Sequence, residues 1–100
     1  MAEGYDELAA LTRSIPRGRC ASYGALGAAL SHPTSGYLVG RWIARTDEDV
    51  PWWRVVSRAG ELRVSKRDPQ LAVLQRRHLE AEGVALVDDR VDMAQYGWTP

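Results

Sequence analysis

Two short helical segments joined by a tight turn constrain the fold of this chain more than any other feature. Ser22 is a plausible N-cap for a helix over residues 23–30, because its hydroxyl can accept a hydrogen bond from a backbone N–H of the first turn. The turn His32-Pro33-Thr34 follows, and Ser35 is a plausible N-cap for a second helix that runs to about Arg45. Two short helices joined in this way match a helix-turn-helix motif.

The segment that follows predicts a small β wing. Residues 54–57 and 61–64 flank Arg58-Ala59-Gly60, which is typical of a hairpin turn. Residues 84–87 are expected to form a further short strand. A wing beside a helix-turn-helix makes a winged-helix module, so we expect a mainly α fold with a small β wing, a winged helix-turn-helix DNA-binding domain.

Further helices are expected at both ends of the chain. Apolar residues at helical spacing predict a helix over residues 5–14. Asp68 and Pro69 suit the start of another helix, and Gly83 suits the position just after its end. The tail over residues 91–98 is expected to fold back on the core.

Length and composition place the chain in a broad class. One hundred residues, 45% of them hydrophobic, suffice for one domain over residues 1–100. The sole cysteine, Cys20, excludes an intrachain disulfide, and one cysteine with two widely spaced histidines gives no metal-site signature, so we expect no cofactor. No apolar run approaches the ~20 residues that cross a bilayer, and the polar start is unlike a signal peptide. We therefore expect a cytoplasmic protein without a membrane partner, associated with the nucleoid if bacterial.

Charge is segregated along the chain although the net charge is zero. Residues 9–46 contain no acid but five arginines: Arg13, Arg17, Arg19, Arg41 and Arg45. Residues 50–67 hold five cations against Glu61 alone. Such segregation can present one basic face, although an ordinary mixed surface is an equal alternative.

A rare pentapeptide, Pro51-Trp52-Trp53-Arg54-Val55, carries a family resemblance. It resembles the active-site motif Pro-Cys-His-Arg-Val of the O6-alkylguanine-DNA alkyltransferases. Four other segments resemble that family in the same order and spacing: Ser22-Tyr23-Gly24-Ala25-Leu26, Val39-Gly40, Ser57-Arg58-Ala59-Gly60 and Leu79-Glu80-Ala81-Glu82-Gly83-Val84. The resemblance covers residues 17–82 and continues less specifically into the tail.

The resemblance implies that the nucleophile is absent. In that family a cysteine, a histidine and a glutamate form a relay that activates the thiol. Trp52 stands at the cysteine position and Trp53 at the histidine position, so only Glu82 of the relay remains. Indole has no lone pair for acid–base chemistry near neutrality, and Cys20 is expected to be a packed small residue. The chain looks like the alkyltransferase-like proteins, which bind alkylated guanine without repairing it, so we expect no enzyme activity and no catalytic residue.

The resemblance also implies a pocket near Trp52 that holds the damaged base. The Trp52 ring would present a flat face to an extruded base, and base–aromatic stacking is worth about 1–3 kcal/mol. Flipping costs a few kcal/mol, and less for a mispaired base, so damaged guanine could be held where normal guanine is not. Whether Trp53 joins this pocket or is a core residue stays open.

The helix-turn-helix supplies the other expected DNA contacts. Tyr23 matches the family tyrosine that pushes on the phosphate of the target nucleotide. Tyr37 stands where the family has the arginine that fills the gap left by the flipped base, and either Tyr37 or Arg41 could fill it here. Gly40 would let the second helix approach the DNA backbone closely.

Two further groups of residues complete the expected site. A basic segment after the turn carries side chains suited to phosphate contacts: Arg63, Ser65, Lys66 and Arg67. Pro51, Arg54 and Glu82 are expected to have structural roles, with Arg54 bridging the motif to neighbouring backbone or a carboxylate.

The function that the resemblance implies is that of a non-enzymatic sensor of O6-alkylguanine in double-stranded DNA. It would bind from the minor groove, flip the base into a pocket near Trp52 and pass the lesion to nucleotide excision repair proteins, acting as a monomer. The alternative is a winged-helix regulator without a lesion pocket. Such regulators commonly dimerise and read the major groove, but this chain shows no dimerisation helix.

Overall fold

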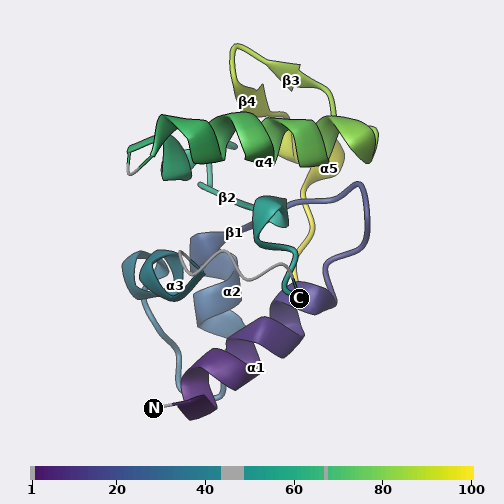
Figure 1. Ribbon diagram of the computed structural model, residues 1–100. Coiled ribbons are helices and arrows are strands. Elements are labelled where there is room, and N and C mark those ends of the chain that lie inside the picture. The colour runs from purple at the N-terminus through teal and green to yellow at the C-terminus, as the bar shows by residue number, and fades with distance from the viewer. Residues whose placement is uncertain (1, 44–48, 67) are drawn as a thin grey trace.

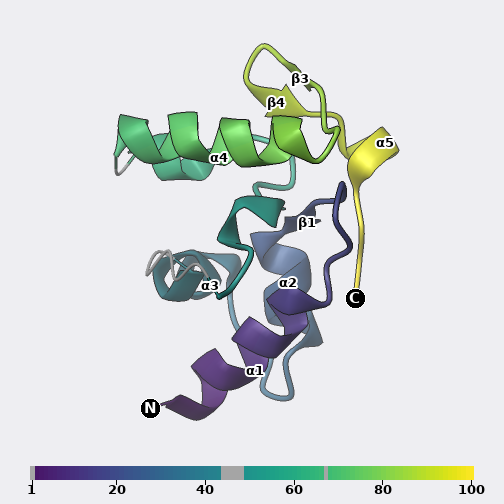
Figure 2. The same cartoon turned by 45° about the vertical axis from the view of Figure 1, so that its right-hand side comes forward.

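The computed structural model of the protein describes residues 2–43, 49–66 and 68–100. Its helices are α1 (Ala2–Arg13), α2 (Tyr23–Ala29), α3 (Gly36–Ile43), α4 (Pro69–Ala81) and α5 (Met93–Tyr96), with 3-10 turns η1 (Trp52–Arg54) and η2 (Arg63–Lys66). Its strands are β1 (Ala21–Ser22), β2 (Val55–Val56), β3 (Leu86–Val87) and β4 (Arg90–Val91). In Figures 1 and 2, α1, α2 and α3 lie at one end of the molecule, α4 and the β3–β4 hairpin lie at the other, and β1, β2 and η1 lie between them.

The helix-turn-helix is formed by α2 and α3. Ser22 caps α2, because its hydroxyl accepts a hydrogen bond from the N–H of Ala25 at 3.1 Å. Ser35 similarly accepts one from the N–H of Leu38 at 3.3 Å. A Cβ atom on Gly27 would lie 2.0 Å from the carbonyl oxygen of Thr34, so only glycine lets the connection to α3 pass this close to α2. The predicted motif is confirmed.

The strand pair beside the helix-turn-helix differs from the prediction. β1 pairs with β2 in parallel, with Ala21 opposite Val55 and Ser22 opposite Val56. The predicted turn exists, since Gly60 has φ +85° and the N–H of Ser57 bonds to the carbonyl of Glu61. Residues 61–64, however, do not form the second strand of a hairpin. Val55 and Val56 are both fully buried, and a strand covered on both faces suits parallel pairing inside the fold better than an exposed wing.

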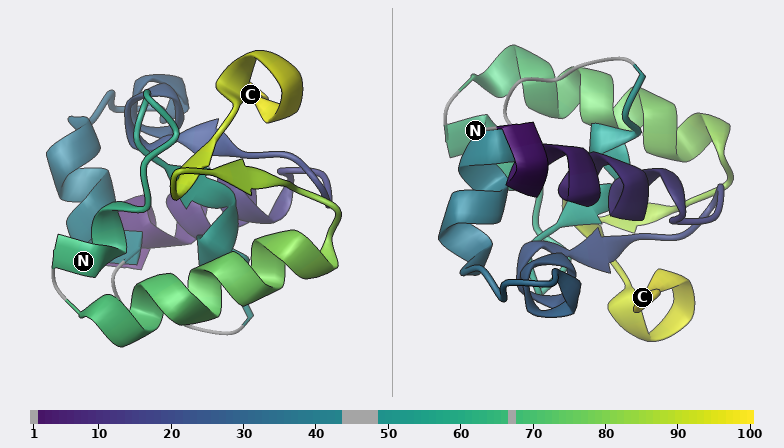
Figure 3. Two further views of the ribbon diagram at one scale, coloured as in Figure 1. Left: turned by 90° about the horizontal axis from the view of Figure 1, so that it is seen from above. Right: turned by 90° about the horizontal axis from the view of Figure 1, so that it is seen from below.

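The antiparallel hairpin of the structure lies later in the chain. β3 pairs with β4, and Asp88 and Asp89 between them have φ +53° and +62°, as in the two-residue turns that match the twist of a hairpin. The predicted strand over residues 84–87 is thus confirmed in part, and its partner was not predicted. Figure 3 shows the hairpin beside α4. The mainly helical class with a small β component is confirmed.

The predicted boundaries of α4 and the predicted return of the C-terminal tail to the core are found in the structure. Asp68 caps α4 by accepting a hydrogen bond from the N–H of Gln70 at 2.9 Å, and Gly83 follows the helix with φ +88°. The tail returns to the core, because the N–H of Cys20 bonds to the carbonyl of Tyr96 at 2.9 Å and the N–H of Trp98 to the carbonyl of Cys20 at 2.7 Å. In the described part of the chain, no helix is long and apolar enough to cross a membrane.

Two buried clusters form the core. The first lies under the helix-turn-helix and consists of Leu8, Ile15, Ala21, Leu26, Leu30, Val39, Ile43, Trp52, Val55 and Val64. The second lies under α4 and the hairpin and consists of Cys20, Val56, Leu62, Leu79, Val84 and Val91. Trp53 packs against both clusters, so the motif connects the two halves of the molecule.

Candidate nucleic-acid interface

An open cleft of about 740 Å³ lies between the helix-turn-helix and the turn after β2. We call it the α2–α3 cleft. Its lining residues are Tyr23, Gly24, Gly36, Tyr37, Gly40, Arg41, Ser57, Arg58, Arg63 and Val64. The structure therefore brings together five of the residues predicted to contact DNA: Tyr23, Tyr37, Gly40, Arg41 and Arg63.

The parallel pairing of β1 with β2 explains why this cleft forms. β1 leads directly into α2 at Tyr23, and β2 leads directly into the turn at Ser57. Because the two strands run in the same direction and in register, their carboxyl ends meet. Arg58 consequently reaches the start of α2, and a Cβ atom on Gly24 would lie 3.9 Å from its guanidinium.

Glycines let α3 pack closely against the Tyr23 side of the cleft. A Cβ atom on Gly40 would lie 3.8 Å from the Tyr23 ring, and one on Gly36 would lie 3.1 Å from the backbone nitrogen of Gly24. In the free protein Gly40 thus faces the Tyr23 ring. Its predicted close approach to a DNA backbone stays a prediction.

Tyr37 and Arg41 are the exposed residues of α3 in this cleft. The Tyr37 side chain lies in the first turn of the helix and is 73% exposed, so it has almost no packing role in the free protein. Arg41 is also exposed and lies one helical turn later. Both candidates for filling the gap in the base stack are therefore accessible.

Trp52 does not line the α2–α3 cleft in the free protein, and its predicted contact with an extruded base stays a prediction. It is 2% exposed and belongs to the first core cluster. Val64 belongs to the same cluster and also lines the cleft, so Trp52 lies in the layer behind the cleft wall. The physical reason is its position in η1, between the two halves of the core, where a large apolar ring is covered from every side.

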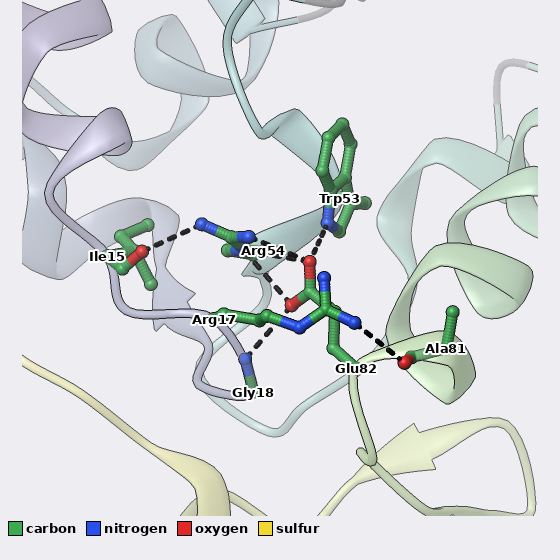
Figure 4. Close-up of polar contacts among 7 residues, drawn as sticks. All are labelled: Ile15, Arg17, Gly18, Trp53, Arg54, Ala81 and Glu82. Atoms are coloured by element: carbon green, nitrogen blue, oxygen red, sulfur yellow. Dashed lines mark hydrogen bonds and ion pairs between the residues drawn. The ribbon is translucent and has the colours of Figure 1, made fainter.

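Trp53 lies outside the cleft as well. Its indole N–H donates a hydrogen bond to Oε2 of Glu82 at 2.9 Å, as Figure 4 shows. Its ring stacks on His78, with centroids 4.0 Å apart and planes 12° apart, and the guanidinium of Arg54 lies 5.7 Å from the ring centroid. At this position the indole donates to the glutamate and has no lone pair with which to accept a thiol proton.

Glu82 receives hydrogen bonds from three residues, Gly18, Trp53 and Arg54 (Figure 4). Arg54 donates to it from Nε at 3.1 and 3.2 Å and from its terminal nitrogen at 2.8 Å, and the N–H of Gly18 donates at 3.0 Å. Arg54 also donates to the carbonyl of Ile15 at 2.9 Å. The Glu82 side chain is only 4% exposed. Burial acts to raise the pKa of Glu82, but the bonds from Arg54, Gly18 and Trp53 outweigh it and hold the pKa below its ordinary value.

Pro51 completes the motif from its N-terminal side. It is buried with a φ of −74°, and its carbonyl accepts a hydrogen bond from the N–H of Arg54 at 3.0 Å. The proline thereby begins the tight turn η1 that directs Trp52 into the core.

Cys20 offers no reactive thiol. It is fully buried in the second core cluster. Burial, with a smaller contribution from the Glu82 carboxylate, raises the pKa of the Cys20 thiol to about 12. Because the thiolate is the nucleophile, this cysteine is inert near neutral pH.

Of the arginines in the acid-free stretch, only Arg41 lines the cleft among the described residues. Arg13, Arg17 and Arg19 donate to the carbonyls of Asp49, Ala81 and Gln95, at 3.0, 3.1 and 2.8 Å. The cleft is lined instead by Arg41, Arg58 and Arg63. Sequence reasoning missed Arg58 as a site residue, and only its place in the family-like turn Ser57-Arg58-Ala59-Gly60 could have indicated it.

Some predicted groups lie outside the described part of the chain. These are the side chains of Ser65, Lys66 and Arg67, the residues that were expected to contact phosphates. Among the described residues, no group of three His, Cys, Asp or Glu side chains could hold a metal ion.

Comparison with known proteins finds similarity to DNA-binding proteins. Residues 4–84 match the family model described as 6-O-methylguanine DNA methyltransferase, DNA binding domain. A DNA base-flipping protein of Vibrio parahaemolyticus is 27% identical over 97 residues, covering 94% of each chain. The DNA base-flipping protein of Escherichia coli is 32% identical over 91 residues, covering 88% of this chain and 68% of the relative.

Two solved structures resemble the whole chain. One is the crystal structure of S. pombe Atl1 in complex with damaged DNA containing O6-carboxymethylguanine, with a TM-score of 0.86 and 28% identity. The other is S. pombe ATL in complex with DNA, with a TM-score of 0.81 and 27% identity. In both cases the match covers 100% of this chain and 98% of the other.

Proposed function

This chain belongs to the family of the 6-O-methylguanine DNA methyltransferase DNA-binding domain, and from that premise we propose that it is a non-enzymatic sensor of O6-alkylguanine in double-stranded DNA. The observation that carries the proposal is the α2–α3 cleft, in which Tyr23 and an exposed Tyr37 lie beside three arginines. The similar S. pombe proteins support this partner, because one is in complex with damaged DNA containing O6-carboxymethylguanine and the other is in complex with DNA.

The cleft combines the two chemical features that a base-flipping protein needs. Guanidinium groups attract the DNA backbone and position the protein on it. Aromatic rings at a helix start can enter the base stack and hold a base out of it. Stacking is worth about 1–3 kcal/mol per base, and extrusion costs a few kcal/mol and least for a mispaired base. A weakly paired O6-alkylguanine would therefore be held extruded more readily than normal guanine.

The residues at the family's catalytic positions argue against alkyl transfer. Trp52 stands where the nucleophilic cysteine would be, and its ring is buried. Trp53 donates its N–H to Glu82. Cys20 is buried and protonated. A protein that holds a lesion without removing it is useful only if another system acts on it, so we propose that the lesion is passed to nucleotide excision repair proteins.

A binding titration tests the proposal. Matched duplexes with guanine or O6-methylguanine at one position should be distinguished, with tighter binding of the alkylated duplex, and both affinities should fall as salt rises because guanidiniums release counterions from phosphates. In the same mixtures a label on the O6-methyl group should stay on the DNA. Equal affinities would favour a winged-helix regulator without a lesion pocket, and label on the protein would refute the absence of transfer.

Tyr37 is the residue that we propose fills the gap left by the flipped base. Replacing it with alanine should lower affinity for the alkylated duplex by about 1–3 kcal/mol, the value of one stacking contact. The brightening of a fluorescent base analogue beside the lesion, which reports unstacking, should largely disappear. Arg41→Ala should weaken binding but keep the brightening.

The matched control for this experiment is Leu38→Ala. Leu38 is the next residue on α3 and is 42% exposed, but it does not line the cleft. Loss of the brightening in Arg41→Ala, with Tyr37→Ala like the wild type, would assign the gap to Arg41 instead.

A further inference from the structure

Among the described residues, Arg58 and Arg63 form no ion pair, unlike Arg76 and Arg90. Both are exposed and line the α2–α3 cleft together with Arg41. No carboxylate lines this cleft, and none of the three forms an ion pair within the described parts of the chain. Arg58 comes from the turn after β2 and Arg63 begins η2, so they belong to a different segment of the chain from α3.

An adjacent cleft shows that the fold pairs its arginines where it has carboxylates nearby. This second cleft, of about 620 Å³, shares Arg63 with the first but is also lined by Glu61, Asp88 and Asp89. Here Arg76 forms an ion pair with Asp89, and Arg90 forms one with Glu61 at 3.4 Å. Among the described residues, the arginines of the α2–α3 cleft thus form no ion pair, although the fold forms ion pairs in the adjacent cleft.

Three cations around one cleft repel each other, and an anion placed among them removes that repulsion. A guanidinium binds phosphate or carboxylate oxygens through two parallel N–H donors, which makes it selective for oxyanions. The guanidinium of Arg58 lies beside Gly24, next to Tyr23. An oxyanion bound there would be adjacent to the tyrosine rings that we propose contact the damaged nucleotide.

We propose that Arg58 and Arg63 form an oxyanion subsite in the α2–α3 cleft. The inference rests on the proposed function, since the anion would belong to the damaged strand. It is either a backbone phosphate or the carboxylate of an acidic O6 substituent such as carboxymethyl. Both sources present the same chemistry to a guanidinium. They differ in which DNA duplexes should lose affinity when the arginines are replaced.

The experiment measures the affinity and salt dependence of Arg58→Ala, Arg63→Ala and the double variant on three duplexes. These carry guanine, O6-methylguanine or O6-carboxymethylguanine at one position. If the anion is a phosphate, all three duplexes should lose affinity alike, and the slope of log affinity against log salt should become shallower by about 0.9 per arginine. If it is the adduct carboxylate, the loss should be confined to the carboxymethyl duplex.

Arg77→Ala is the matched control, because Arg77 is exposed on α4, lines neither cleft and carries the same charge. Arg58→Lys should keep the salt slope but lose part of the affinity, because it retains the charge without the paired donors. Melting curves would establish that each variant is folded. If the Arg58 and Arg63 variants have the same affinity and salt dependence as Arg77→Ala on every duplex, the proposal of an oxyanion subsite is wrong. If the wild type binds no duplex, the proposed function is wrong and the subsite falls with it.

Discussion

Replacing Glu82 with glutamine is expected to lower the free energy of unfolding by about 3–5 kcal/mol, the usual cost of removing one partner of a buried ion pair. The substitution keeps the shape of the side chain but leaves the Arg54 guanidinium, whose side chain is 15% exposed, without its counterion. It also weakens the acceptor for Gly18 and Trp53. Urea denaturation of both proteins measures the difference.

Glu80→Gln is the control, because Glu80 lies in the last turn of α4, just before Glu82, but is exposed. Its stability should match that of the wild type. If Glu82→Gln has the wild-type free energy of unfolding, the hydrogen bonds around Glu82 make no net contribution to stability. The structural role proposed for this residue would then be wrong.

The ion pair between Arg54 and Glu82 should also make the stability of the protein depend on pH in the acidic range. The folded protein holds the pKa of Glu82 below its ordinary value of 4.5, so the unfolded chain binds more protons in that range. The contribution of Glu82 is therefore complete above pH 4.5 and is lost as pH falls through the folded pKa. The wild type should lose stability there more steeply than Glu82→Gln. Glu7, whose pKa is lowered by hydrogen bonds from Ser31, titrates in both proteins and cancels in the comparison.

Trp52→Ala is expected to lower the free energy of unfolding by about 3–5 kcal/mol, as truncation of a buried tryptophan does. The ring is 2% exposed and contacts Trp53 edge-on, with centroids 6.1 Å apart. Removing it leaves a cavity in the first core cluster. Thermal melting measures the loss, and Trp52→Phe, which keeps an aromatic ring, should lose less.

DNA binding by the same variant separates two roles for Trp52. If Trp52 is a core residue, any loss of affinity should accompany the loss of stability and affect damaged and undamaged duplexes alike. Unchanged melting with a selective loss on the alkylated duplex would instead mean that the ring becomes exposed when DNA binds and that it stacks on the flipped base.

Trp53 and Glu82, which stand at relay positions of the family motif, have structural contacts in this protein. Glu82 accepts hydrogen bonds from the motif, from the loop before β1 and from Trp53, and thereby joins α4 to the helix-turn-helix half of the molecule. The indole of Trp53 fills the space between His78 and Arg54. Both contacts stabilise the scaffold, and neither requires proton transfer.

Much of the secondary structure could be predicted from local chemistry. The caps at Ser22, Ser35 and Asp68 mark the starts of three helices, because capping depends only on a side chain and the N–H groups two or three residues later. Gly83 marks the end of α4 for a similarly local reason, its positive φ. The prediction was wrong for residues 61–64, because strand pairing depends on a distant partner and β2 pairs with β1.

The sequence by itself determined the helix-turn-helix, the family resemblance and the loss of a thiol from the motif, since each depends on residue identity and short-range spacing. Only the tertiary structure decided that Trp52 lies in the core and that Arg58 and Arg63 line one cleft with Tyr23. Burial and charge clustering depend on which distant segments meet. In this protein the parallel pairing of β1 with β2 brings the two sides of the cleft together. These strands are only two residues long, so no local sequence pattern predicts them.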